Sequence, residues 1–166
     1  MMLLRKVFTA KRFGAASAFF TAIFLSLLLI ICPHFRSYRQ SLLVHSSLSG
    51  NTGVMKLSLA LGADANDFEC QTSYCWTPLV SAAAANQSEA VRLLLDRGAD
   101  INKKLKRGPT ALMIASFHGD IEMVKLLLSN GADVNADCDG DTALRWAKQK
   151  GHPDVVNLLI ASGATR

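Results

Sequence analysis

Cys70 and Cys75 are the residues whose spacing comes closest to a chemical site. Four residues separate them and no histidine is near in the sequence, so they supply too few ligands for a zinc site, which takes four. In an oxidising compartment the two thiols could form a local disulfide, and in a reducing one they would stay unpaired in a loop. An exchange role for this pair would require a lowered thiol pKa.

Other patterns typical of enzymes or metal sites are incomplete. Asp137, Asp139 and Asp141 have the spacing of the first ligands of a calcium loop, but the glycine and the distal glutamate of such a loop are absent. The sequence has no motif of a serine hydrolase, zinc protease or phosphate-binding loop. We therefore expect no enzymatic activity, no cofactor and no metal. The histidines are scattered at positions 34, 45, 118 and 152.

A repeated motif sets the positions of these residues. Gly-Ala-Asp recurs at residues 62–64, 98–100 and 131–133, each time with an asparagine two residues after the aspartate, and Gly163-Ala164 is a partial fourth copy. Successive glycines are 36, 33 and 32 residues apart. This is the period of a unit that buries its apolar face by stacking on copies of itself. Such stacks form extended binding surfaces, so the repeat favours binding over catalysis.

Each unit carries the signals of two helices. A threonine opens the first helix, where its hydroxyl can cap free N–H groups, and Pro78 suits the first helical position because a donor there would be unpaired. The second helix has apolar residues at the spacing of one helical face, which predicts a core, and a glycine ends it. The threonines are Thr77, Thr110 and Thr142, and the expected core residues are Val91, Leu94, Leu95, Val124, Leu127, Leu128, Trp146, Val156, Leu159 and Ile160.

From Thr-Pro-Leu at residues 77–79 to Gly-Ala-Asp-x-Asn at residues 98–102, the unit resembles the ankyrin repeat. The histidine that often follows Thr-Pro-Leu in that family is replaced by Val80, Met113 and Arg145. The resemblance implies an all-α solenoid of helix-turn-helix repeats with hairpin connections. It predicts an ankyrin-repeat domain at residues 41–166, made of a degenerate repeat at 41–68 and repeats at 69–101, 102–134 and 135–166.

The segment before the repeats is apolar. Residues 14–32 are uncharged for 19 residues, about the length with which a helix crosses a bilayer. We expect a transmembrane signal-anchor helix there, between a basic N-terminal segment at residues 1–13 and a short linker at residues 33–40. A buried helix is one alternative. A cleaved signal, which would release a secreted soluble protein, is another, although Pro33 follows the stretch and a small-residue cleavage site is missing.

Charge indicates the orientation and the kind of partner. Four basic residues precede the apolar stretch and Arg36 and Arg39 follow it, which favours a cytoplasmic N-terminus and an extracytoplasmic repeat domain, periplasmic in a bacterium. Residues 33–166 hold 14 basic and 13 acidic residues, so we expect no nucleic-acid binding. One connection is basic, with Lys103, Lys104, Lys106 and Arg107, and the next is acidic, with Asp137, Asp139 and Asp141.

We therefore expect a membrane-anchored scaffold that binds another protein through its concave face and hairpin tips, with no small-molecule substrate. The alternatives are the secreted form and an extracytoplasmic stress or redox protein that uses Cys70 and Cys75. The contact positions usual in the resembled family imply a set of partner-binding residues. These are Ser73, Tyr74, Trp76, Ala84 and Ala85, then Lys106, Arg107, Pro109, Phe117 and His118, and finally Cys138, Asp139, Asp141, Gln149 and Lys150.

Overall fold

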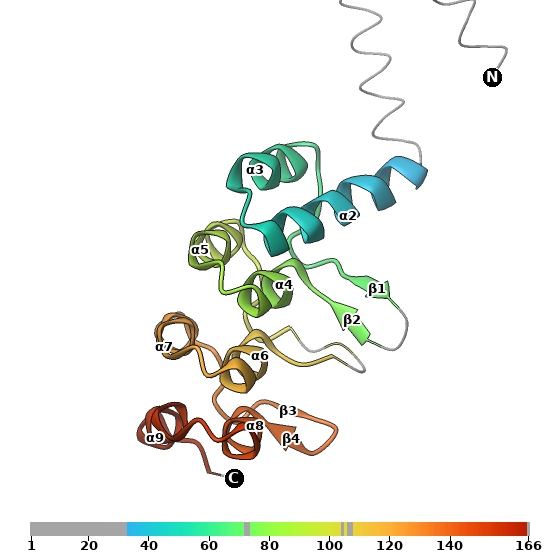
Figure 1. Ribbon diagram of the computed structural model, residues 1–166. Helices are drawn as coiled ribbons and strands as arrows, with labels where there is room; N and C mark the ends of the chain where they lie inside the picture. The colour runs from blue at the N-terminus through green and yellow to red at the C-terminus, as the bar shows by residue number, and fades with distance from the viewer. Residues whose placement is uncertain (1–32, 72–73, 104, 106–107, 166) are drawn as a thin grey trace, which may run out of the picture. The chain divides into compact units, whose positions relative to one another are not determined.

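The computed structural model describes residues 33–71, 74–103, 105 and 108–165. Ser37–Arg166 form one compact unit. In Figure 1, α4, α6 and α8 lie one below another, with α5, α7 and α9 in a second layer beside them and hairpins on the opposite side. The helices are α2 (Pro33–Ser49), α3 (Thr52–Ala60), α4 (Pro78–Ala84), α5 (Ser88–Asp96), α6 (Ala111–His118), α7 (Ile121–Ser129), α8 (Ala143–Lys150) and α9 (Pro153–Ala161).

Short antiparallel hairpins connect the helix pairs. β1 (Glu69–Gln71) pairs with β2 (Tyr74–Trp76), and the register places Cys70 opposite Cys75. β3 (Asp137–Cys138) pairs with β4 (Asp141–Thr142). Between α5 and α6, a single bridge joins Leu105 and Gly108. The mostly helical solenoid with hairpin connections is therefore confirmed, and the hairpins project from the α4, α6 and α8 side.

The threonine caps are confirmed in three repeats. Thr77 Oγ1 accepts a hydrogen bond from the Val80 N–H at 3.1 Å, and Pro78 occupies the first turn of α4. A side-chain oxygen in this position satisfies an N–H group that has no partner inside the helix. Thr110 caps Met113 and Thr142 caps Arg145 in the same way, each at 3.3 Å.

The core follows the predicted face of the second helices, with corrections in the last repeat. Leu94, Leu127 and Leu159 are fully buried. Val155, rather than the half-buried Val156, is the buried valine of α9, and Ile160 is 52% exposed. The positions equivalent to Ile160 are the half-buried Leu95 and Leu128, whose helices have a following repeat to cover them. α9 packs on α8 and α7, and no described element covers its other side.

Asparagine side chains join neighbouring repeats. Asn102 Nδ2 donates to the Gly131 carbonyl oxygen at 3.1 Å, and Asn102 Oδ1 accepts from the Asp133 N–H at 2.7 Å. Asp100 holds the backbone of this loop, because its Oδ1 accepts from the backbone N–H of Asn102 at 2.9 Å. The motif Gly-Ala-Asp-x-Asn is therefore the connector between repeats. Asn66 makes the same contacts with Gly98 and Asp100, and Asn135 makes them with Gly163 and Thr165.

The start of the array differs from the expectation. α2 begins at Pro33, so residues 33–40 are helical and not a linker. The helix runs through Ser41, where the other repeats have their threonine cap. Gln40 is 6% exposed; its Nε2 donates to the Asp64 carbonyl oxygen at 3.0 Å and its Oε1 accepts from the Asp64 N–H at 3.2 Å. With this double contact Gln40 holds the loop at Asp64, as the asparagines hold the later loops. Because Gln40 is part of α2, the contact also holds the part of the helix before residue 41.

The apolar stretch at residues 14–32 lies outside the described residues. Among the helices that the structure does describe, none combines the length and the hydropathy that a membrane span requires.

Leu127→Ala tests the register of the core. The side chain is fully buried, so its removal leaves a cavity and should lower the free energy of unfolding by about 2–5 kcal/mol. Leu57→Ala in α3 is the matched control, because Leu57 is 55% exposed and surface changes usually cost under about 0.5 kcal/mol. Chemical denaturation of the full-length chain, followed by circular dichroism, measures both. Equal effects of the two changes would contradict the register.

Candidate functional site

The first helices of the repeats, α2, α4, α6 and α8, present one set of equivalent positions. Each is followed by a residue with left-handed backbone, and the residues five, two and one positions before it lie on one helical face. We call this set the inner face. The five-before residues are His45, Ser81, Ile114 and Trp146, the two-before residues are Leu48, Ala84, Phe117 and Gln149, and the one-before residues are Ser49, Ala85, His118 and Lys150.

Three rings and a cation meet on the inner face of α6 and α8. The Phe117 ring centroid is 5.6 Å from that of Trp146 and 5.3 Å from that of His118, both in edge-to-face geometry. Lys150 Nζ lies 4.2 Å from the Phe117 centroid, a cation–π contact. We call these four residues the aromatic cluster. Trp146 was expected in the core but is half-buried: it packs against the core with part of its surface, and its ring contacts that of Phe117 on α6.

The neighbouring repeats hold this cluster together. One ring nitrogen of His152, Nε2, lies 3.0 Å from the Phe117 carbonyl oxygen. Gly119 sits against the same imidazole, where a Cβ would come within 2.5 Å of Nδ1. The end of α6 is thus fixed against the turn after α8, and the Phe117 ring is positioned over the next repeat.

The other predicted contact residues are spread over the same side. Ala84 and Ala85 are half-buried, whereas His118 and Gln149 are exposed. Pro109 is buried and was wrongly assigned as a contact residue. The residue before it explains this: a Cβ on Gly108 would lie 2.8 Å from the Cys75 carbonyl oxygen, so this connection packs closely on β2. Ser73, Lys106 and Arg107, together with Lys104, lie outside the described residues, and Tyr74 is described only as a strand residue.

The tip of the β3–β4 hairpin is acidic but partly neutralised. Asp137 and Asp139 are exposed, and Cys138 and Asp141 are half-buried. Arg145 Nη1 lies 3.1 Å from Asp141 Oδ1 and donates to the Gly140 carbonyl oxygen at 3.2 Å. Both side chains of this pair are largely solvated, so it adds little stability. The exposed Asp137 and Asp139 have no such ion pair with any residue that the structure describes.

The β1–β2 hairpin combines an aromatic, a carboxylate and a disulfide. Trp76 is half-buried and packs against the core, and it lies opposite Glu69 in the register. Cys75 is disulfide-bonded. The cross-strand partner of Cys75 is Cys70.

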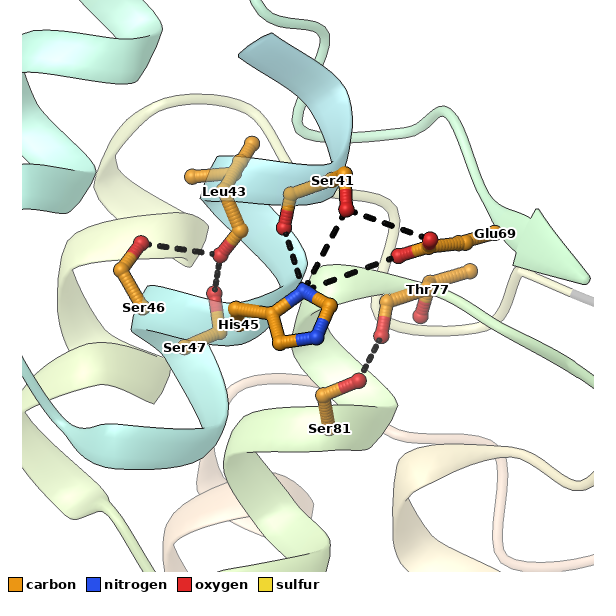
Figure 2. Close-up of polar contacts among 8 residues, drawn as sticks. All are labelled: Ser41, Leu43, His45, Ser46, Ser47, Glu69, Thr77 and Ser81. Atoms are coloured by element: carbon orange, nitrogen blue, oxygen red, sulfur yellow. Dashed lines mark hydrogen bonds and ion pairs between the residues drawn. The ribbon is translucent and has the colours of Figure 1, made fainter. Parts of the chain in front are cut away.

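A serine, a histidine and a glutamate meet beside this hairpin, and the sequence analysis did not anticipate them. Figure 2 shows His45 and Glu69 pointing toward one another, with Ser41 above them. Ser41 Oγ lies 3.4 Å from His45 Nδ1 and donates to Glu69 Oε1 at 3.2 Å, while Glu69 Oε2 is 4.0 Å from the same Nδ1. A catalytic triad needs the serine and the acid on opposite ring nitrogens. Because both groups contact Nδ1, this geometry does not form a relay.

Metal ligation finds no support in the described part of the chain, where no group of three or more histidine, cysteine, aspartate or glutamate side chains could hold an ion.

Known proteins share the repeat. The chain is 39% identical over 76 residues to a 2-5A-dependent ribonuclease of Mus musculus, which covers 46% of this chain and 10% of that protein. It is 36% identical over 104 residues to the ankyrin repeat domain-containing protein 63 of Mus musculus, covering 60% and 27%. It is 45% identical over 87 residues to the E3 ubiquitin-protein ligase XBAT32 of Arabidopsis thaliana, covering 51% and 17%.

The chain thus spans between a tenth and about a quarter of the length of these relatives. The family described as ankyrin repeats (3 copies) matches residues 15–105 and 103–165, which together include most of the sequence. With its threonine caps, asparagine connectors and stacked helix pairs, the chain belongs to the ankyrin repeat family.

Proposed function

We propose that this chain is a membrane-anchored scaffold that binds another protein through the inner face of its repeats. Ankyrin repeats generally mediate protein–protein interaction and are in general non-catalytic. The main observation that supports a particular binding surface is the aromatic cluster of Phe117, His118, Trp146 and Lys150, on the inner face of α6 and α8. It gathers large rings and a cation on one surface, and tryptophan, which it includes, is among the residues enriched at the hot spots of protein interfaces.

The charges around the cluster indicate how a partner is oriented. Lys148 and Lys150 are exposed on α8, and Asp137 and Asp139 are exposed at the adjacent hairpin tip. A partner with an acidic group over α8 and a basic group over the hairpin would meet complementary charge at both places. Such charges act mainly on orientation and association rate. The ring contacts then supply most of the affinity.

The membrane proposal rests on the apolar sequence of residues 14–32 and on its flanking charges. Four basic residues before this stretch and two after it support a cytoplasmic N-terminus and an extracytoplasmic repeat domain. The disulfide at Cys75 supports the same side, because disulfides persist in oxidising compartments. We further propose Cys70 as the partner of Cys75, since the two residues face one another in the β1–β2 register.

Trp146→Ala tests the aromatic cluster. A photo-crosslinking residue at the exposed Gln149 first identifies the partner in cells, and the same residue at the exposed Asn157 of α9 is the control position. Against the purified partner, Trp146→Ala should weaken binding roughly thirtyfold, the effect of losing a hot spot of about 2 kcal/mol. Ile160→Ala, at an exposed apolar residue of α9, should leave affinity unchanged. Parental affinity of a folded Trp146→Ala variant would refute this use of the cluster.

Alkaline carbonate washing tests the anchor. The full-length chain should stay in the membrane pellet, because an apolar stretch of 19 residues inserts into the bilayer. A soluble species shortened by about 32 residues would instead indicate a cleaved signal. A soluble chain of full length would place residues 14–32 inside the folded protein.

Mass spectrometry without reduction tests the Cys70–Cys75 bond. Trypsin should release residues 57–92, which contain both cysteines, as a peptide two hydrogen atoms lighter than its reduced form. Reduction before alkylation is the control, since it should add two alkyl groups to the same peptide. Alkylation of both thiols in intact cells without a reductant would refute the bond.

A further inference from the structure

A cavity of about 230 Å³ lies between α2, the β1–β2 hairpin and α4. Its walls combine apolar and polar side chains. Its position at the five-before residues of α2 and α4 places it on the inner face, at the end of the array away from α8. The lining residues are Val44, His45, Leu48, Glu69, Trp76 and Ser81.

Glu69 gives the cavity its charge. Its Oε1 accepts a hydrogen bond from Ser41 Oγ at 3.2 Å, but its Oε2 is buried and accepts no hydrogen bond from any residue that the structure describes. The His45 ring lies beside it: Nδ1 is 4.0 Å from Oε2 and 2.9 Å from the Ser41 carbonyl oxygen. A buried carboxylate oxygen without a donor is costly. An incoming donor would remove this cost.

The remaining walls suit an aliphatic stem that ends in a planar cation. Val44 and Leu48 supply apolar surface from α2, and Leu48 is 49% exposed. Trp76 supplies a ring on which a guanidinium can stack. His45, whose side chain is 62% exposed, lies beside the buried Oε2 with its Nδ1 4.0 Å away, so a guanidinium would reach that oxygen only after the imidazole moves aside. Ser81 contributes no free donor, since its hydroxyl already donates to the Thr77 carbonyl oxygen at 3.1 Å.

We propose that this cavity receives an arginine side chain of the protein partner. The guanidinium donates to Glu69 Oε2 and stacks on Trp76, while its methylene groups contact Val44 and Leu48. The inference rests on the proposed protein-binding function and adds a second contact point to it. An arginine is favoured over a lysine because its planar fork matches a carboxylate and an aromatic face together.

Binding of N-acetyl-arginine amide to the purified full-length chain tests the cavity directly. With 5-fluorotryptophan in place of tryptophan, the chain gives fluorine signals for its two tryptophans, and Trp146→Phe assigns them. Arginine amide should shift the Trp76 signal in a saturable way and leave the Trp146 signal in place. Glu69→Gln should weaken binding about tenfold, the effect of losing a charge-assisted hydrogen bond. Glu89→Gln, at an exposed carboxylate of α5, is the matched control and should bind like the parent.

Two further probes make the result decisive. N-acetyl-norleucine amide has an aliphatic stem without a charge, and equal binding of this probe would overturn the proposal in favour of a purely apolar slot. Tighter binding of N-acetyl-lysine amide would overturn the preference for arginine. If Glu69→Gln does not fold, His45→Ala takes its place in the test. Removal of the imidazole should make Oε2 accessible and tighten arginine binding. Unchanged or weaker binding by His45→Ala would refute the role of that oxygen.

The outcomes separate this inference from the proposed function. The amino-acid probes need no partner, so an absent Trp76 shift refutes the arginine cavity while Trp146→Ala can still weaken partner binding. Conversely, the parent chain can bind arginine amide while Trp146→Ala leaves its affinity for the partner unchanged. That pair of results refutes only the role of the aromatic cluster in partner binding.

Discussion

The amide of the asparagine in each Gly-Ala-Asp-x-Asn motif sets how one repeat lies on the next. Both atoms of the Asn102 amide are used, one on the Gly131 carbonyl oxygen and one on the Asp133 N–H. These bonds are solvent-exposed, so each contributes only about 0.5–1.5 kcal/mol net. Burial of a leucine such as Leu127 contributes about 1.5–3 kcal/mol but has no direction. Apolar burial therefore supplies most of the stability, and the asparagine connectors supply the spacing.

The two ends of the array depart from the motif and keep the contact between loops by other residues. At the C-terminal end Thr165 replaces the aspartate of the next loop, and its backbone N–H donates to Asn135 Oδ1 at 2.9 Å. At the other end Gln40 clamps both backbone groups of Asp64 from a helix instead of a loop. To include Gln40 the helix must begin before residue 41, and α2, which begins at Pro33, has 17 residues where α4 has seven. Ser41 on this helix donates to Glu69 of β1, and His45 lies one turn further along, beside the same carboxylate.

The repeat was predictable from the sequence because its signals are local. Thr77 and Pro78 stabilise the start of the helix that follows them. The Gly-Ala-Asp-x-Asn spacing predicts the loop that ends each repeat, together with its asparagine connector. The start of α2 was missed because Ser41 aligns with the capping threonines, and the bonds that override this cap join residues 24 positions apart. Pro109 was misassigned because its burial depends on the approach of Gly108 to Cys75. The Glu69 cavity gave no sequence signal, since its lining comes from three separate elements.

Comparison of the repeats within this one chain separates a position whose residue type is constant from one whose residue type varies. The residues seven before each left-handed turn are Leu43, Leu79, Leu112 and Leu144, all leucine and at most 3% exposed. Two residues later the same helices have His45, Ser81, Ile114 and Trp146, four different chemistries on one scaffold. The first position is a buried leucine in all four repeats, whereas the second accepts different side chains, which are buried at Ser81 and Ile114 and more exposed at His45 and Trp146. The row offers a partner a carboxylate cavity at one end, and rings with an exposed lysine at the other, beside the exposed aspartates of the β3–β4 tip. A partner that binds at both ends would have to match two different charge patterns, which favours one direction of binding along the inner face.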